Sequence, residues 1–202
     1  MIKDVKLEPL KSPRFIQPAL MRYEERGVQK SWELVKAHDS VAILIYNSDQ
    51  DALVLVRQFR PAVYLANQDG YSYELCAGIV DKEKSLEAIA SEEISEETGY
   101  HVPPQKLQRV SSFYTSVGFA GNQQVLYFAV VTDRDRRGQG GGVDVEQIEV
   151  LHLPTQEARA FMFDESKVKT PGLMFGFYWF FEQHQRGHHQ AFHVGSDLKA
   201  EG

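Results

Sequence analysis

Residues 78–100, GIVDKEKSLEAIASEEISEETGY, decide how this chain folds. A glycine and a lysine-rich loop precede a helix that is predicted from about Leu86 to Thr98 and that ends before Gly99. At about 100° per residue, one side of this helix carries an apolar arc that should face a core. The arc consists of Leu86, Ile89, Ala90 and Ile94.

Two acids of this stretch lie on the apolar side of the predicted helix. Glu93 and Glu97 fall inside the arc, and Glu96 lies at its edge. Carboxylates four residues apart in a core-facing stripe repel each other and lose hydration. A divalent cation would remove both penalties. The alternative is a solvated acidic face, the usual role of glutamate-rich helices, but Glu93 and Glu97 share their side of the helix with the apolar residues.

The composition is that of an ordinary globular domain. The 202 residues are 43% apolar and 25% charged, and the net charge of −6 argues against a general nucleic-acid surface. No apolar run reaches the length of a membrane span, and the N-terminal residues lack the apolar core of a signal peptide. The single cysteine, Cys76, has apolar neighbours, which favours a buried inert thiol over a nucleophile. We therefore expect a cytoplasmic protein with no membrane or nucleic-acid partner.

Residues 1–38 are expected to form an accessory antiparallel sheet ahead of a main domain at 39–185. Prolines divide this region into short strand-like runs, and a turn is predicted near Gly27. Trp32 lies in a polar setting, KSWEL. Its ring either packs on the sheet or stacks on a ligand base.

The main domain opens with a predicted hairpin, residues 40–47 and 52–60, joined by a polar turn. Both faces of the second strand are apolar, which is typical of a central strand. Arg60 ends that strand and is placed either to pair with an acid or to bind an anion. Residues 62–70 are predicted as a loop, and 71–78 as one short strand leading into the decisive stretch.

The C-terminal half is predicted to contain more strands and a mobile connector. Strands are expected within 107–121 and 122–132, followed by the charged and glycine-rich connector 133–142. In the next strand, Asp144 and Glu146 should share one face because side chains alternate with a period of two.

Two helices are predicted to follow, at 155–163 and from Pro171 onward, the second with Thr170 as its N-cap. The second helix is apolar nearly all round and is expected to be buried in the domain or at a subunit contact. Residues 186–202 are expected to form a flexible tail. Its three histidines, which are not expected to bind metal there, are His188, His189 and His193.

The acids Glu93, Glu96, Glu97, Asp144 and Glu146 offer only oxygen ligands. Oxygen ligands favour a hard cation, Mg²⁺ or Mn²⁺, over zinc. Carboxylates that leave metal positions open suit phosphate substrates, whose oxygens complete the coordination shell. The acids therefore predict metal-assisted chemistry on a phosphate compound.

Residues 78–100 also resemble the Nudix box, which reads G, five residues, E, seven residues, then R-E-U-x-E-E-x-G-U with U a bulky apolar residue. The matching positions are Gly78, Glu93, Ile94, Glu96, Glu97 and Gly99. Two positions depart from the pattern. Lys84 stands where the first glutamate belongs, and Glu92 stands where the arginine belongs. The missing arginine raises the question of what orients the carboxylates.

Outside the box, about residues 15–185 resemble the UDP-sugar diphosphatase (UDP-glucose pyrophosphatase) branch of the Nudix hydrolases, close to the ADP-ribose diphosphatases. The resemblance implies an α+β fold, an α/β/α sandwich with a mixed sheet, preceded by a small N-terminal antiparallel sheet. It implies a homodimer formed through that N-terminal sheet. It also implies Mg²⁺-dependent hydrolysis of a nucleoside diphosphate sugar, foremost UDP-glucose to UMP and glucose 1-phosphate.

The same resemblance implies roles for individual residues at the metal. Glu93 and Glu97 are the expected main Mg²⁺ ligands, assisted by the backbone carbonyl of Ala77. Glu96 is expected to be a supporting ligand or to sit just behind the ligands. Glu146 matches an acid on a mobile loop that acts as a ligand or as the general base, and Glu93 and Glu97 share the catalytic role.

Three further residues are expected at the substrate. Arg60 matches an arginine that holds a substrate phosphate in the ADP-ribose relatives. Trp32 matches a position whose ring stacks on the nucleobase across the dimer interface. Asp144 is a second candidate for the general base besides Glu146.

Two other functions remain open from the sequence. One is an ADP-ribose diphosphatase that releases AMP and ribose 5-phosphate, because base and sugar contacts come from loops with no sequence code. The other is a sensor that binds nucleotide sugars without cleaving them, for which the departures at Lys84 and Glu92 leave room. The complete set Glu93, Glu96 and Glu97 favours the enzyme, since a binder has little use for like charges in an apolar stripe.

Overall fold

A mixed sheet of seven strands forms the centre of the molecule around β3, Ser40–Asn47. The computed structural model describes residues 2–185, so the predicted tail 186–202 and its three histidines lie outside the described residues. β3 pairs in parallel with β8, and every other pair in this sheet is antiparallel. The order is β5-β4-β3-β8-β7, with β6 also on β3 and β9 on β4. The other strands are β4 Ala52–Phe59, β5 Tyr71–Glu74, β6 Cys76–Ile79, β7 Gln108–Tyr114, β8 Gln123–Val131 and β9 Ile148–Pro154.

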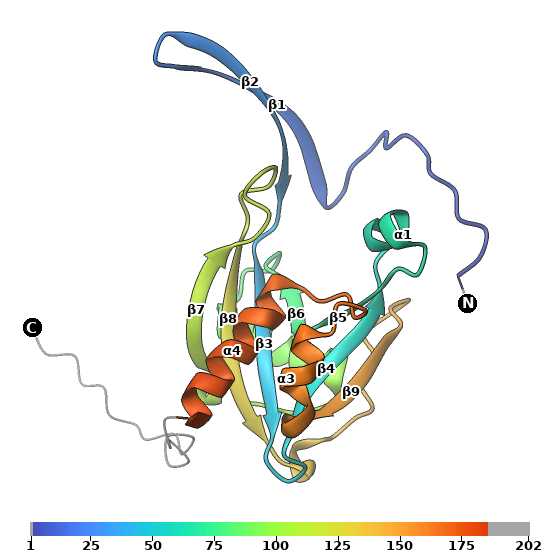
Figure 1. The fold of residues 1–202 in the computed structure, drawn as a ribbon, viewed down its shortest axis with the longest axis vertical. Coiled ribbons are helices and arrows are strands. Elements are labelled where there is room, and N and C mark those ends of the chain that lie inside the picture. Colours follow the sequence, from blue (N-terminus) through green and yellow to red (C-terminus); the bar gives the residue numbers. More distant parts are fainter. Residues whose placement is uncertain (1, 186–202) are drawn as a thin grey trace, which may run out of the picture.

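Helices cover both faces of this sheet because its central strands are apolar on both faces. On β3, Val41, Ile43 and Ile45 pack toward α2, whereas Ala42 and Leu44 pack toward α3 and α4 (Figure 1). The predicted α/β/α sandwich is therefore confirmed. The helices are α1 Pro61–Asn67, α2 Leu86–Glu93, α3 Thr155–Phe163 and α4 Pro171–Gln185, with short helical turns η1 Ile94–Thr98, η2 Pro104–Lys106 and η3 Asp133–Asp135.

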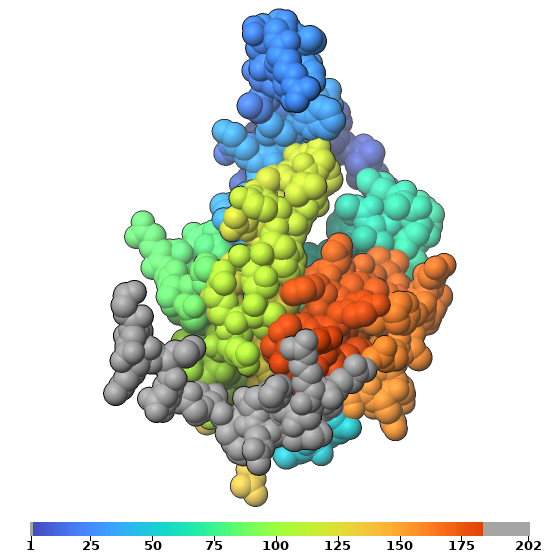
Figure 2. Space-filling view, turned by 60° about the vertical axis from the view of Figure 1, so that its left-hand side comes forward, coloured from blue at the N-terminus to red at the C-terminus, as the bar shows by residue number. Residues whose placement is uncertain are grey.

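A separate two-stranded hairpin, β1 Ile16–Glu25 and β2 Val28–Ala37, projects from the body (Figures 1 and 2). Its two-residue turn uses positive φ angles at Arg26 (52°) and Gly27 (78°), the conformation that matches the twist of a hairpin. The predicted N-terminal antiparallel sheet and its turn near Gly27 are confirmed.

The hairpin lacks a core of its own. Nearly all its side chains are exposed, including Leu20, Met21 and Trp32, which retain 52%, 53% and 55% of their accessible surface. The amide of Val35 donates to the Phe119 carbonyl at 2.7 Å, which ties the base of the hairpin to the β7–β8 loop. A solvated two-stranded sheet is only marginally stable by itself.

Three local predictions are wrong. Residues 62–70, predicted as a loop, contain most of α1, which begins with Pro61 and is too short to show a helical period. The single strand predicted at 71–78 is two strands, β5 and β6, which pair with different neighbours. Asp144 and Glu146 do not share a strand face, because the chain turns at Asp144 (φ 53°) and β9 begins only at Ile148.

The connector 133–142, predicted to be mobile, is held to the end of the helix in the decisive stretch. The Gly99 carbonyl accepts from the amides of Arg137 and Gly138, at 2.8 and 3.1 Å. The amides of Gly141 and Gly142 donate to the carbonyls of Glu97 and Glu96, at 2.8 and 3.0 Å. Its charge and glycines suggested a linker, but these bonds fix its path.

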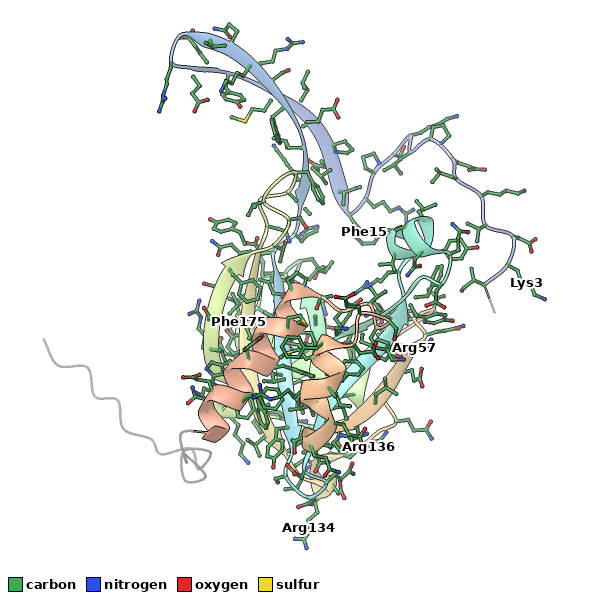
Figure 3. All side chains as sticks on the ribbon, viewed as in Figure 1. Lys3, Phe15, Arg57, Arg134, Arg136 and Phe175 are labelled. Atoms are coloured by element: carbon green, nitrogen blue, oxygen red, sulfur yellow. The ribbon has the colours of Figure 1, made fainter. Side chains whose placement is uncertain are left out.

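Within the single chain, α4 buries one face in the domain and leaves the other exposed, so burial of its second face at a subunit contact stays a prediction. Leu173, Phe177 and Phe180 lie in the core, whereas Phe175 and Tyr178 retain 41% and 52% of their surface. Figure 3 shows Phe175 on the side of α4 that faces β7, where its ring centre lies 5.6 Å from that of Phe113. No helix within residues 2–185 has the length and apolarity needed to cross a membrane.

Candidate active site

The helix predicted at 86–98 is present and ends where expected. Ser85 caps its start by accepting from the Ala88 amide at 3.2 Å, and Gly99 (φ 75°) ends it in a left-handed conformation. Its last five residues, Ile94–Thr98, form a π-helical turn rather than an α-helical one. Single π turns inside helices are common at functional sites.

Glu93 lies so close to the backbone of Gly78 that a Cβ there would clash with the Glu93 side chain in its present position. A Cβ at Gly78 would stand 2.1 Å from the Glu93 Cδ and 2.2 Å from its Oε1. The first glycine of the stretch therefore lets the carboxylate rest directly on β6. Burial raises the pKa of Glu93 to about 7, and the nearby charge of Glu96 adds to the rise.

Glu97 is buried with 5% of its surface exposed, and its Oε2 accepts from the Ala77 amide at 3.0 Å. Burial raises its pKa to about 8 against the hydrogen bonds from the Ala77 amide and the Cys76 thiol, and the charge of Glu93 raises it further. Cys76 is itself fully buried, and burial raises the pKa of its thiol, which fits the inert role expected for it. The contact of Ala77 with Glu97 is through its amide, whereas the sequence predicted a role for its carbonyl.

Glu93 and Glu97 fit a cation in their chemistry. Glu97 is buried, Glu93 is partly buried, and both have raised pKa values. The charge of Glu93 adds to the rise at Glu97, and the charge of Glu96 adds to the rise at Glu93. Each of these side chains can bind a metal only through its oxygens, which are the ligands that Mg²⁺ and Mn²⁺ prefer. Within residues 2–185, no three carboxylate, imidazole or thiol groups converge on one point. A cation here would therefore be held by this pair, with other oxygens completing its shell.

The other three predicted acids, Glu96, Glu146 and Asp144, differ in their exposure and in their contacts near this pair. Glu96 is half-buried on the same turn, and its charge raises the pKa of Glu93. Glu146 is exposed, and its Oε2 accepts from the Val143 amide at 3.0 Å. Its charge nevertheless contributes to the raised pKa values of Glu93 and Glu97, and its segment is tied to their helix because the Gly142 amide donates to the Glu96 carbonyl at 3.0 Å. Asp144 is exposed in the turn, where its φ angle is 53°.

Arg60 pairs with an acid that sequence reasoning missed. Its Nε and Nη2 donate to the two carboxylate oxygens of Glu74 at 2.8 and 2.6 Å, and the Ser72 hydroxyl donates to Glu74 at 2.5 Å. These hydrogen bonds raise the pKa of Arg60, to which the charges of Glu97 and Glu146 also contribute. Glu74 is buried, yet the Arg60 hydrogen bonds hold its pKa below the ordinary value. Arg60 is thus fixed near the carboxylates by a two-pronged ion pair.

The two departures from the Nudix box form an ion pair with each other. The Lys84 ammonium lies 2.5 Å from Glu92 Oε1, and Lys82 lies 3.6 Å from the other oxygen. The pattern has an acid at the first position and a base at the second, so this chain holds the same pair with its charges exchanged. The pair ties the loop after Gly78 to α2 immediately before Glu93.

Trp32 lies on the projecting hairpin and not in the core. Its indole Nε1 donates to the Gly118 carbonyl on the β7–β8 loop at 2.7 Å. No contact joins it to Glu93 or Glu97 of the same chain within the described residues. Among the predicted site residues, the structure therefore brings together Glu93, Glu96, Glu97, Glu146, Ala77 and Arg60 and leaves Trp32 apart.

A cavity of about 390 Å³ opens beside Ala77 and Glu74. Its other walls come from the end of β7, the β7–β8 loop and the start of α4. Its volume lies in the range of small-molecule sites. Glu93, Glu96, Glu97 and Glu146 do not line it, so the cavity adjoins the site only through Ala77 and Glu74.

Comparison with known proteins identifies the family. A model of the NUDIX domain matches residues 36–170. The chain is 42% identical over 196 residues to uridine diphosphate glucose pyrophosphatase NUDT14 of Bos taurus, covering 83% of this chain and 88% of that protein. The Mus musculus protein of the same name is 41% identical over 198 residues, covering 84% and 89%. GDP-mannose pyrophosphatase of Cronobacter sakazakii is 38% identical over 140 residues, covering 69% and 72%. With its box glycine against Glu93 and these matches over most of its length, the chain belongs to the Nudix hydrolase family.

Proposed function

We propose that this enzyme hydrolyses the pyrophosphate bond of a nucleoside diphosphate sugar with Mg²⁺, converting UDP-glucose to UMP and glucose 1-phosphate. The observation that carries the proposal is that two carboxylates, the buried Glu97 and the partly buried Glu93, lie together on the core side of one helix. The names of the two mammalian relatives support UDP-glucose as the substrate.

Glu93 and Glu97 would hold the cation, with Glu96, Glu146 and the carbonyl of Ala77 as further oxygen donors. The bound cation would withdraw charge from the pyrophosphate oxygens and lower the pKa of a water molecule. Mn²⁺ offers the same oxygen chemistry and is expected to replace Mg²⁺.

The protein's own residues supply the proton transfer and the charge balance. Glu146, exposed on the turn beside the glutamate pair, takes the proton of the attacking water. The water oxygen bonds to one phosphorus, the bond from that phosphorus to the bridging oxygen breaks, and the bridging oxygen leaves with the second phosphate. Arg60, held in place by Glu74, offers its remaining guanidinium donors to a phosphate oxygen. Asp144 is the second candidate for the base.

The substrate proposal is tested with a panel of compounds and Mg²⁺, with the products identified by mass. UDP-glucose, ADP-ribose and GDP-mannose are compared at equal concentration. We expect the highest kcat/KM for UDP-glucose, with UMP and glucose 1-phosphate as products. The similarity to GDP-mannose pyrophosphatase makes the guanine compound the second candidate. A higher kcat/KM for ADP-ribose than for UDP-glucose would instead make the chain an ADP-ribose diphosphatase.

The same panel separates an enzyme from a sensor. A sensor would bind a nucleotide sugar saturably and release no monophosphate with either Mg²⁺ or Mn²⁺ present. Release of product by the wild-type chain, and its loss in Glu97→Gln, excludes that alternative.

The exposed hairpin supports a homodimer in the proposal. A two-stranded sheet with apolar side chains exposed on both faces gains stability when a second subunit covers it. A partner's hairpin could then bring its Trp32 to the nucleobase. A cytoplasmic location agrees with the free thiol of Cys76.

A further inference from the structure

The β7–β8 loop lies against the base of the projecting hairpin (Figures 1 and 2). Trp32 of β2 donates its indole N–H to the Gly118 carbonyl at 2.7 Å, and the Val35 amide donates to the Phe119 carbonyl, also at 2.7 Å. A parallel bridge joins Val35 to Ala120. Three consecutive loop residues are therefore attached to one strand. We infer that Trp32 is a positioning residue which, through the β7–β8 loop of its own chain, fixes one wall of the cavity of about 390 Å³.

The hydrogen bond of Trp32 leaves the faces of its ring free. The indole N–H is the only polar hydrogen of this side chain, and the bond to the loop uses it. An indole N–H donates in the plane of the ring, so the bond sets the direction of the ring without covering its faces. More than half of the side-chain surface remains exposed. Positioning of the loop is therefore a role within one chain, separate from stacking of the same ring on a base.

The β7–β8 loop has little packing of its own to hold its shape. Within the loop, all of whose residues the structure describes, Ala120 alone is buried, and Val117 and Phe119 are mostly exposed. A Cβ added at Gly118 or Gly121 would meet nothing within 4 Å. Segments with few buried contacts open at a low cost in free energy. The bonds from the hairpin should therefore contribute much of the order of this loop.

The same loop forms part of the cavity wall. Thr115 and Ser116 line the cavity. The Ser116 carbonyl accepts from the amides of Phe119 and Ala120, at 3.1 and 2.7 Å. The loop residues that contact the hairpin thus also bind back to a wall residue. A loop released from the hairpin should therefore displace Ser116 and change the shape of the cavity.

The consequence for the substrate rests on the proposed function. The cavity adjoins the candidate metal site through Ala77, whose amide donates to Glu97. It also adjoins Glu74, which holds Arg60. A nucleoside diphosphate sugar is longer than the pyrophosphate bound between the metal and the arginine, so one of its ends should contact this wall. Loss of the Trp32 hydrogen bond should therefore weaken substrate binding and leave the chemical step unchanged.

Amide hydrogen exchange on the substrate-free chain tests the positioning of the loop. Trp32→Phe keeps an aromatic ring and removes the N–H donor. We expect exchange about fivefold faster at the amides of Phe119 and Ala120, because one of the hydrogen bonds that hold the loop is lost. Tyr23→Phe is the matched control, since it removes a polar hydrogen from another aromatic ring of the hairpin. Tyr23 lies on β1 opposite Lys30, nearer to the turn, and its replacement should leave loop exchange unchanged.

Two exchange results would overturn the inference. Equal exchange of the loop amides in Trp32→Phe and in the wild type would show that the indole bond does not hold the loop. Faster exchange along the whole of β1 and β2 would show that the variant loosens the hairpin itself. Both measurements are made without metal or substrate, so they do not depend on whether a nucleotide sugar is cleaved.

The kinetic test compares Trp32→Phe with Trp32→Ala on UDP-glucose and Mg²⁺. Phenylalanine largely replaces a ring that only stacks on a base, whereas neither variant can donate to the Gly118 carbonyl. We expect the KM of Trp32→Phe to rise about fivefold, which should be most of the rise in Trp32→Ala, with kcat unchanged in both. A wild-type KM in Trp32→Phe beside a raised KM in Trp32→Ala would assign the residue to stacking alone and overturn the inference. Absence of hydrolysis by the wild type would instead contradict the proposed function, and the exchange result would still decide whether Trp32 positions the loop.

Discussion

Two residues that depart from the Nudix box compensate each other. Lys84 replaces an expected glutamate and Glu92 replaces an expected arginine. From the sequence alone, the metal-binding carboxylates therefore lacked the arginine that should orient them. The 2.5 Å contact between them shows an ion pair with its charges exchanged. The sequence could not reveal this pairing, because it requires the loop after Gly78 to fold back on α2.

This exchanged ion pair predicts a rescue experiment. Lys84→Glu and Glu92→Arg alone each place like charges together and should lower kcat by about tenfold to a hundredfold, the usual effect of residues that orient metal ligands. The double variant, which restores the order of the box, should recover most of the activity. Exchanging Lys30 and Glu25 on the hairpin, also an ion pair, is the matched control and should leave kcat unchanged. Additive losses in the double variant would show that the residues act independently.

Glu97 is the most buried acid of the site. Replacing it by glutamine tests whether its carboxylate is needed for hydrolysis in a chain that still folds. Glu97→Gln keeps the shape and an acceptor for the Ala77 amide but removes the charge that a cation needs. We expect a folded protein whose Mg²⁺-dependent hydrolysis falls on the order of a thousandfold. Circular dichroism checks the fold, and product release checks activity. Activity within a few fold of the wild type would remove Glu97 from the metal site.

At the scale of elements, the decisive contact is between β6 and the catalytic helix. A glycine at position 78 admits Glu93 onto the strand, and the π turn then buries Glu97 against the Ala77 amide. The Gly78 backbone and the helix thus set the positions of both carboxylates. A change at either element should disturb catalysis before it disturbs the core.

Gly78→Ala tests this contact directly. The new Cβ meets the far end of a flexible side chain, so Glu93 should move aside and the fold should survive. Displacing a catalytic group by about 1 Å costs about a hundredfold in rate, and we expect that loss with only a small change in melting temperature. Gly121→Ala is the control, because a Cβ there meets nothing within 4 Å. Equal activity of the two variants would contradict the role given to Gly78.

The elements also show why prediction succeeded in some places and failed in others. The β3–β4 hairpin and the helix at 86–98 were predictable, because apolar runs and caps mark them. The π turn was not, because it changes the hydrogen bonding without changing the composition. Arg60 could be singled out from its place after a strand, but its partner Glu74 is a lone acid in an apolar segment. Such pairings depend on strand register, which neighbouring residues do not encode.

At the scale of the whole molecule, the buried glutamates cost stability when no metal is bound. Burial raises the pKa of Glu93 to about 7 and that of Glu97 to about 8, from an ordinary value of 4.5. Between pH 4.5 and these raised pKa values, the folded state holds more protons than the unfolded state. The free energy of unfolding therefore falls as pH rises through this interval. One pKa unit corresponds to about 1.4 kcal/mol.

We therefore expect the melting temperature in EDTA to fall between pH 5 and pH 8, and Mg²⁺ to restore most of the loss at pH 8. Other groups also titrate in this interval, since burial lowers the pKa of His152 and gives an opposite slope. Subtracting the melting temperatures of Glu97→Gln from those of the wild type at each pH gives the contribution of Glu97 to the pH dependence. Parallel curves for the two proteins, in EDTA, would show that Glu97 does not carry this pH dependence.

The hairpin predicts the assembly of the molecule. Leu20 and Met21 alternate between its two faces and both are exposed, so a monomer would leave apolar surface in water on each side. We expect light scattering after gel filtration to give twice the chain mass of 23.0 kDa. The double variant Leu20→Lys, Met21→Lys should shift this mass to the monomer and raise the KM, because the partner's Trp32 is withdrawn from the substrate. Tyr178→Lys, at an equally exposed position on α4, is the control. A monomer produced by Tyr178→Lys alone would place the interface on α4, whose exposed aromatic face is also an apolar surface that a second subunit could cover.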